Sequence, residues 1–245
     1  MREIDNTGER ILLEKETPLM IARHFCAYKY AKDFVGGKEV LDIGCGEGYG
    51  SNFLAGFAKS VLGIDYNAAI IDYAKNKYLR PGLEYVVLDI KNLPSLNRKF
   101  DVICSFQNIE HIRDTDKLLK DISALLKDDG VFVCSTCNIK DASPNSKVPF
   151  NKFHVREYLA SEFKELLEGC FNKVEISGLR RSAALKFNRR LKKIGLFNFL
   201  PAGSDPVKRY FTKADCRYFF WSEKKLDSCL DFIAVCSKQK GSQLK

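Results

Sequence analysis

The sequence contains no apolar run of about 18 residues, the length that a helix needs to cross a bilayer. Its first 16 residues are charged and have no apolar centre, so they do not resemble a secretory signal, and we expect a cytoplasmic protein. Internal repeats and low-complexity segments are also missing. Because 45% of the residues are hydrophobic and 29% are charged, the composition excludes a disordered chain, a coiled coil and a collagen.

Regularly spaced metal ligands are scarce as well. The chain has three histidines, and its nine cysteines are odd in number and irregularly spaced. Cys134 and Cys137 form a lone C-x-x-C, whereas a zinc site needs a second pair or histidines at ligand spacing. Most cysteines lie in apolar stretches, where cysteine behaves as a small buried hydrophobe. We therefore predict reduced cysteines that pack in the core, and no metal site.

Short apolar segments alternate with helical patterns along most of the chain. Thr17 and Pro18 predict the start of a helix that runs to about Val35. Alternation of this kind gives a parallel sheet covered on both faces, whose ligands bind beyond the carboxyl ends of the strands. We expect seven strands, at 38–44, 60–65, 83–90, 99–106, 131–137, 173–179 and 229–238.

A glycine-rich segment, VLDIGCGEGYG, joins the first expected strand to a helix at 40–50. Gly44 and Gly46 allow a tight turn and a close approach of a ligand to the backbone. Dinucleotide sites carry G-x-G-x-x-G, but Tyr49 stands where the third glycine would be. A P-loop is excluded because no Gly-Lys-Ser/Thr follows. The loop therefore does not indicate a pyrophosphate site.

The same stretch, LDIGCGEGYG, resembles the first motif of the class I S-adenosylmethionine-dependent methyltransferases. Segments similar to the later motifs follow in the family's order: LGID ending at Asp65, VVLDI with Asp89, FDVICSFQNIEHI and LLKDDGVFVCST. The resemblance covers about residues 17–140 and is closest to the methyltransferase type 11 group, whose members act on small molecules, quinones and glycans. NKFHVREY, at 151–158, is similar to a stretch in bacterial members linked to surface-polysaccharide genes.

The resemblance implies a Rossmann-like, doubly wound α/β fold and S-adenosyl-L-methionine as the cofactor. Its second motif implies that Asp65 binds both ribose hydroxyls, since a carboxylate can accept a cis-diol through two charge-assisted hydrogen bonds. Asp89 would face the adenine amine and Tyr66 the adenine ring; the alternatives are helix-capping acids and a surface tyrosine. The expected cofactor-binding residues are Asp42, Gly44, Cys45, Gly46, Asp65, Tyr66, Asp89, Ile90 and Phe106.

Methyl transfer requires an oriented acceptor, and also a base when the nucleophile has a high pKa. Glu110 and His111 follow the fourth expected strand, and His154 lies in the segment after the fifth. We expect His154, and after it His111, to be the catalytic residue that accepts the proton. The alternative for each histidine is a structural role at the entry of a helix or in a loop.

The fourth motif lacks the Asn/Asp-Pro-Pro-Tyr/Phe run that is usual in methylases of nucleobase amines, and residues 105–108 read Ser-Phe-Gln-Asn instead. This disfavours a nucleic-acid amine as the acceptor. We expect O-methylation of a small-molecule or glycan acceptor, with N-methylation of an amino sugar left open. An RNA methyltransferase and an inactive cofactor-binding or membrane-associated partner protein are the alternatives.

The positive charge of the chain is concentrated in one segment. Residues 178–213 carry ten basic side chains and one acid, which equals the net charge of +9 of the whole chain. Ala184, Phe187, Leu191 and Ile194 recur at helical spacing among the cations and predict a basic amphipathic helix. Three interpretations stay open: a lid whose apolar face packs on the domain, a peripheral contact with an anionic membrane, and a groove for an anionic acceptor such as a nucleotide sugar or RNA.

The sequence thus predicts one seven-stranded methyltransferase domain at 37–245, preceded by an N-terminal helical lid at 1–36. The basic insertion at 178–213 belongs to the domain. Its expected partners are S-adenosyl-L-methionine and a small acceptor, and contact with the inner face of the membrane is left open.

Overall fold

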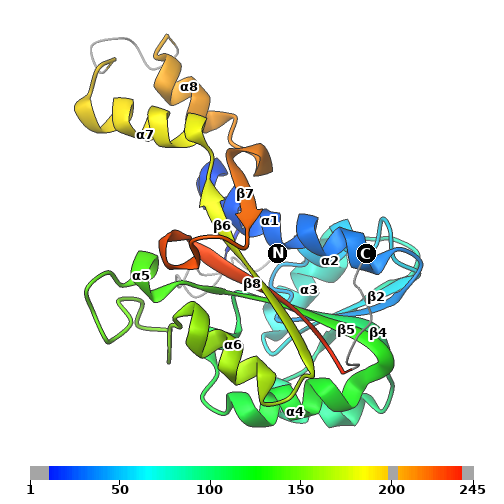
Figure 1. The fold of residues 1–245 in the computed structure, drawn as a ribbon. Helices are drawn as coiled ribbons and strands as arrows, with labels where there is room; N and C mark the ends of the chain where they lie inside the picture. The colour runs from blue at the N-terminus through cyan, green and yellow to red at the C-terminus, as the bar shows by residue number, and fades with distance from the viewer. Residues whose placement is uncertain (1–10, 198–203, 239–245) are drawn as a thin grey trace.

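The computed structural model describes residues 11–197 and 204–238. An eight-stranded sheet runs through these residues in the order β3-β2-β1-β4-β5-β8-β6-β7 (Figure 1). Strands β1 to β5 pair in parallel, whereas β8 is antiparallel to both β5 and β6, and β7 is antiparallel to β6. The strands are β1 (Glu39–Ile43), β2 (Ser60–Asp65), β3 (Leu83–Val87), β4 (Phe100–Phe106), β5 (Leu126–Cys137), β6 (Lys173–Arg181), β7 (Phe219–Ser222) and β8 (Asp231–Ser237).

Helices cover both faces of the sheet. α1 (Pro18–Val35) and α2 (Tyr49–Leu54) pack on one face, and α4 (Thr115–Leu125) and α6 (Ala160–Glu168) on the other (Figure 1). In the described part of the chain, no helix has both the length and the apolar character needed to cross a membrane. The remaining elements are α3 (Ala68–Lys77), α5 (Ile139–Ala142), α7 (Ala183–Ile194) and α8 (Pro206–Thr212), with short 3₁₀ turns η1 (Ile90–Leu96), η2 (Ile109–His111), η3 (Cys216–Tyr218) and η4 (Leu226–Ser228).

The central strands β1, β2, β4 and β8 are buried on both sides because each side faces a helical layer. Successive side chains of a strand point to opposite faces. In β1, Val40 packs in the cluster beneath α1 and α2, while Leu41 and Ile43 pack in the cluster above α4 and α6. Seven of the nine cysteines are buried as free thiols, including Cys134 and Cys137, which agrees with the predicted packing role.

Helix α1 begins and ends as the sequence predicts. The Thr17 hydroxyl accepts a hydrogen bond from the Met20 N–H at 3.3 Å, and Pro18 occupies the first helical position, where its missing N–H costs nothing. The helix ends before Gly36, and its last turns bury Ala31 and Val35 completely. Residues 1–10 of the expected N-terminal lid lie outside the described residues.

The expected count of seven strands is wrong, because the sheet has an eighth strand. β7 has only four residues, which is too short for an alternating pattern to indicate it. It pairs with Gly178–Arg181, so β6 continues to Arg181 and the first residues of the expected insertion 178–213 belong to the sheet. Between the two strands, α7 and α8 project beyond the end of the sheet (Figure 1).

The predicted basic helix is present as α7, but the side chain that packs on the domain does not belong to the predicted apolar stripe. Leu185 is fully buried in a cluster with Ala22 of α1, whereas Phe187 is 60% exposed and Ile194 is 68% exposed. Phe187 lies about 200° around the helix from Leu185. Of the three interpretations left open, the packing of this apolar stripe on the domain is contradicted at Ala184, Phe187 and Ile194, which are exposed, whereas Leu191 is partly buried.

The crossing of α1 and α2 depends on a glycine. A Cβ atom at Gly50 would lie 1.9 Å from the Tyr28 ring. We predict that Gly50→Ala destabilises the protein by about 1–3 kcal/mol, because overpacking outweighs the better helix propensity of alanine.

Gly36→Ala is the matched control, since its Cβ would have nothing within 4 Å. We expect it to be neutral or to stabilise by about 0.4–1 kcal/mol. Urea unfolding of both variants measures the difference. Equal free energies of unfolding for the two variants would contradict the predicted clash.

Candidate active site

One cavity, with a volume of about 1140 Å³, opens where the carboxyl ends of the parallel strands meet. Its wall is formed by the glycine loop after β1, the residues after β2, β3 and β4, the end of β5, and the first half of α1. The order of the sheet reverses between β1 and β4, and such a switch point is where doubly wound sheets bind ligands.

The glycine loop folds over the end of β2. Gly44, Gly46 and Gly48 all have positive φ angles, of +72°, +54° and +86°, which explains the choice of glycine. The backbone N–H groups of Gly44 and Cys45 both donate to the Ile64 carbonyl, at 2.9 and 3.0 Å. Gly44 and Cys45 line the cavity, whereas Gly46 donates its N–H to the Asp65 carboxylate.

Asp65 ends β2 and presents its carboxylate at the cavity wall with 8% of the residue exposed. One oxygen, Oδ1, accepts from the Asn67 N–H at 2.9 Å, and the other, Oδ2, from the Gly46 N–H at 3.2 Å. Each carboxylate oxygen keeps a further lone pair for a ligand. The other predicted residues on this wall are Tyr66, Asp89, Ile90 and Phe106.

Asp42 is placed differently from the prediction. It has no exposed surface, and it accepts hydrogen bonds from the Ser51 hydroxyl at 2.6 Å and the Tyr28 hydroxyl at 3.3 Å. Burial raises the pKa of its carboxyl to about 7. Asp42 thus joins β1 to α1 and α2 beneath the glycine loop. The burial of Asp42 contradicts the expected direct contact with the cofactor. Asp42 instead supports the glycine loop from beneath.

All three histidines of the chain line the same cavity, from three separate segments. His24 comes from α1, His111 from η2 and His154 from the segment before α6. Sequence reasoning gave His24 no role, because nothing local links it to the others. Desolvation by burial lowers the pKa of His24 to about 4, so its imidazole is neutral at pH 7.

His154 is held by hydrogen bonds on both ring nitrogens. Its Nδ1 lies 2.7 Å from the Glu157 Oε1 atom, and its Nε2 lies 3.0 Å from the Asn151 amide nitrogen. The amide orientation is fixed because the Asn151 oxygen accepts from the Phe153 N–H at 3.0 Å. The network therefore assigns the proton to Nδ1, which donates to Glu157, and leaves Nε2 as the acceptor.

The segment that carries His154 is fastened to the end of β4. The Glu110 carbonyl accepts from the N–H groups of Val155 and Arg156, at 2.7 and 3.2 Å. His111 Nδ1 lies 2.9 Å from the Phe153 carbonyl, and the rings of His111 and His154 meet edge to face with centroids 4.9 Å apart. Both predicted base candidates thus lie side by side on one wall.

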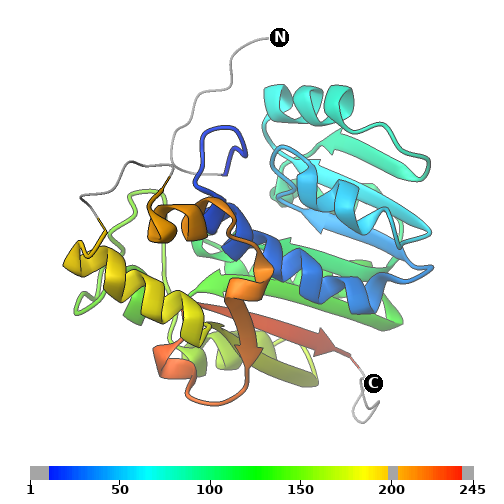
Figure 2. The same ribbon diagram turned by 90° about the horizontal axis from the view of Figure 1, so that it is seen from above.

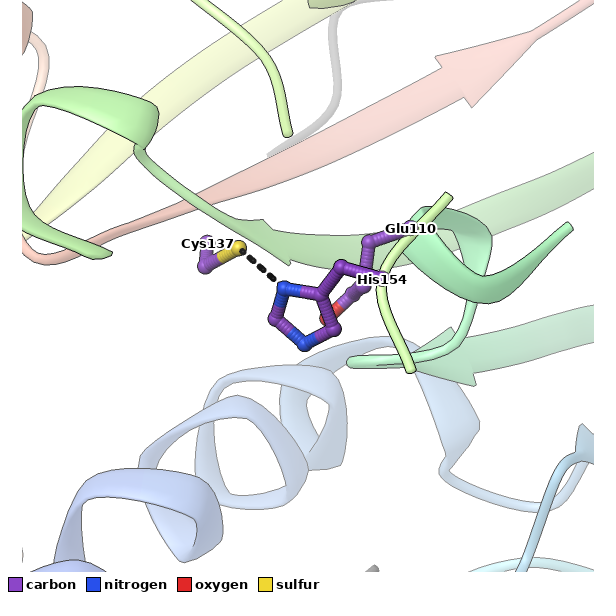
Figure 3. Close-up of side chains that lie close together, drawn as sticks. All are labelled: Glu110, Cys137 and His154. Atoms are coloured by element: carbon purple, nitrogen blue, oxygen red, sulfur yellow. Dashed lines mark hydrogen bonds between the residues drawn. The ribbon is translucent and has the colours of Figure 1, made fainter. Parts of the chain in front are cut away.

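Within the described residues, Glu110, Cys137 and His154 form a group whose ligand atoms lie within 4.8 Å of one another, close enough to hold a metal ion (Figure 3). The His154 Nδ1 atom already donates to Glu157, and burial raises the pKa of the Cys137 thiol far above its ordinary value. A thiol binds metal only after losing its proton. Within the group the structure shows a contact of 3.8 Å between Cys137 Sγ and His154 Nδ1, while the Glu110 carboxylate accepts from Thr136 instead.

Two charged residues of the wall were missed by the sequence analysis. Glu157 stands three residues after His154 inside NKFHVREY, so this segment already contained the pair. Arg23 makes a bidentate ion pair with Asp231, both N···O distances being 2.7 Å. These two residues are 208 positions apart, and no sequence spacing indicates their contact.

Glu110 is buried and its Oε2 atom accepts from the Thr136 hydroxyl at 2.9 Å. Burial raises the pKa of this carboxyl from 4.5 to about 8. The folded protein therefore binds this proton more tightly than the unfolded chain, and the stability from it falls as pH rises from about 4.5 towards 8.

We predict that Glu110→Gln gains stability over the parent protein as pH rises through this range, by up to about 1.4 kcal/mol for each pH unit. Urea unfolding at pH 5, 6.5 and 8 measures the difference. Glu165→Gln, on the exposed side of α6, removes the same charge as a control. A constant difference between Glu110→Gln and the parent at all three pH values would contradict the prediction.

Comparisons with known proteins identify the family of the chain. A family model described as a methyltransferase domain matches residues 35–191. A protein of Mycolicibacterium smegmatis named "probable S-adenosylmethionine-dependent methyltransferase" is 36% identical over 69% of this chain, and a ubiquinone biosynthesis O-methyltransferase of Coxiella burnetii is 36% identical over 42% of it. The matches span 65% and 44% of those relatives' lengths.

Solved structures give the same fold. A crystal structure of an S-adenosylmethionine-dependent methyltransferase from Thermotoga maritima superposes with a TM-score of 0.63 at 14% sequence identity, covering 90% of this chain and 91% of that one. The family model covers more than half of the residues. The chain therefore belongs to the methyltransferase-domain family and has the class I S-adenosylmethionine-dependent methyltransferase fold.

Proposed function

We propose that this protein transfers the methyl group of S-adenosyl-L-methionine to a hydroxyl group of a small-molecule or glycan acceptor, with His154 as general base. The observation that carries the proposal is the His154–Glu157 pair, 2.7 Å apart, in the wall of the cavity that also contains Asp65. A histidine oriented by a buried carboxylate is a recurrent arrangement for proton removal from a hydroxyl.

The residues at the glycine-loop end of the cavity fit S-adenosyl-L-methionine. The Asp65 carboxylate has lone pairs directed at neither of its two backbone donors, and these suit a ribose cis-diol. Gly44 lets a ligand approach the backbone, and Phe106, Ile90 and Tyr66 supply apolar surface for an aromatic ring. When bound, the cofactor supplies a methyl group already activated on a sulfonium sulfur, so the protein mainly has to orient the acceptor.

His154 would accept the proton of the acceptor hydroxyl at its Nε2 atom. The Asn151 amide occupies this nitrogen in the structure, and an incoming hydroxyl would replace it. Glu157, through the hydrogen bond to Nδ1, holds the ring orientation and stabilises the positive charge that the ring gains. His111 packs edge to face on His154 and is a positioning residue in this mechanism.

The hydroxyl acceptor is supported by the relative named ubiquinone biosynthesis O-methyltransferase and by the absence of a proline pair in the fourth motif. The proposed enzyme must methylate an acceptor, whereas an inactive cofactor-binding protein would bind S-adenosyl-L-methionine without methylating anything. The proposed enzyme also requires an acceptor small enough to reach His154 within the cavity, which distinguishes it from an RNA methyltransferase.

Asp65→Ala tests the cofactor site. We expect this variant to weaken S-adenosyl-L-methionine binding by roughly 2–4 kcal/mol, because it removes a charged double acceptor. Asp72→Ala, which removes an exposed carboxylate of α3, is the control and should bind like the parent. Isothermal titration gives both affinities, and equal affinities for the two variants would exclude the assignment of Asp65 to the ribose.

His154→Ala tests the base. S-adenosylhomocysteine release across a panel of phenols, sugars and nucleotide sugars first identifies an acceptor that the parent methylates. With that acceptor we expect His154→Ala to lower kcat by about 10²–10⁴-fold. Added imidazole should restore part of the activity, because a free base can occupy the vacated space.

Glu157→Gln should lower kcat less than His154→Ala does and leave the acceptor KM nearly unchanged, as befits a positioning residue. Full activity of His154→Ala would exclude it as the base. S-adenosyl-L-methionine binding without turnover of any acceptor class would favour the inactive partner protein instead.

A further inference from the structure

A second cavity, of about 840 Å³, lies between the start of α1, helix α7 and helix α8. Figure 2 shows α7 and α8 beside the first turns of α1. The volume of this second cavity is within the range of small-molecule sites. Basic side chains dominate its lining: Arg181, Lys186, Arg189, Arg190, Lys192 and Lys193. We call this cavity the basic groove.

The charge of the basic groove is largely uncompensated. Arg181 pairs with Asp141 at 3.1 Å. Within residues 11–197 and 204–238, the other five cations have no carboxylate within 4.0 Å, and α7 itself contains no acid. Asp205, the one acid of the insertion, caps α8 and lies 3.8 Å from Lys208. Five cations on one concave wall repel one another, and a bound polyanion would relieve that repulsion.

The start of α1 adds to the positive potential of the basic groove. Thr17, Pro18 and Leu19 line it, so the amino end of an 18-residue helix lies at its edge. The helix dipole places partial positive charge at that end. It acts together with the cations of α7, which come from a different part of the chain.

The basic groove adjoins the active-site cavity. Arg23 and Asp141 line the active-site cavity and Arg181 lines the groove. Asp141 lies between the two arginines, 3.8 Å from Arg23 and 3.1 Å from Arg181. The first turns of α1 form a shared wall, with Met20 on one side and Leu19 on the other. A ligand longer than the active-site cavity could therefore extend into the groove.

We propose that the basic groove binds a diphosphate group of the methyl acceptor, while the acceptor hydroxyl lies near His154. This inference rests on the proposed function for the acceptor and deepens it to an organic diphosphate. Arginine and lysine side chains bind phosphate oxygens through charge-assisted hydrogen bonds. The exposed Phe187 and Ile194 do not line the groove, so the cations are what a ligand there would meet.

The test measures binding of inorganic pyrophosphate and uridine diphosphate by isothermal titration at low and high salt. The groove variant changes Arg189, Arg190, Lys192 and Lys193 to Gln, and all four side chains are exposed, so we expect it to fold. The control variant changes four other exposed lysines to Gln and removes the same charge: Lys75, Lys99, Lys120 and Lys224.

We expect the groove variant to lose at least tenfold in affinity for both probes, and the control variant to bind like the parent. The parent's affinity should fall as salt rises, because exposed charges are screened. Circular dichroism and the melting temperature check that both variants fold.

The proposal is overturned if the parent binds neither probe, or if the control variant loses as much affinity as the groove variant. Binding to phosphatidylglycerol vesicles that only the groove variant loses, without binding of either probe, would overturn it in favour of a lipid surface. Titration with S-adenosyl-L-methionine is independent of these results. Probe binding by a parent that does not bind S-adenosyl-L-methionine would refute the proposed function and leave the anion site standing.

Discussion

The parallel pairing of β1 with both β2 and β4 is the constraint on which the rest of this structure depends. It brings the carboxyl ends of neighbouring strands to one edge, so the loops that follow them form a common wall. The glycine loop, Asp65 and the Glu110–His111 turn meet there, although 21 residues separate Gly44 from Asp65 and 45 separate Asp65 from Glu110. The fold therefore assembles the candidate site from short local segments.

The same edge gathers buried charge, and the protein stabilises each charge differently. Asp231 pairs with Arg23, Glu157 accepts a hydrogen bond from His154 Nδ1, and Glu110 has a pKa raised to about 8 by burial. An unpaired buried charge would cost several kcal/mol. Each of these carboxylates therefore has a cation, a hydrogen-bond donor or a proton, and the hydrogen bond to Glu157 also fixes the His154 ring.

The insertion between β6 and β7 extends the fold without disturbing the sheet. β7 pairs with β6 and forms the last strand of the sheet. Leu185 packs α7 on α1 in the cluster that contains Ala22. Because Leu185 takes the inner side of the helix, the stripe with Phe187 faces away from the domain. The cations of α7 then form a concave wall against α8 and the start of α1.

The sequence alone determined most of the helices and strands and the glycine loop. Capping by Thr17, the apolar strands and the glycines at positive φ are local properties, so their prediction needed no tertiary structure. The tertiary structure decided what depends on contacts between distant segments: the burial of Asp42 beneath the loop, the pairing of Arg23 with Asp231, and the four-residue strand β7. It also brought three histidines into one cavity, because only packing places α1 against the ends of β4 and β5.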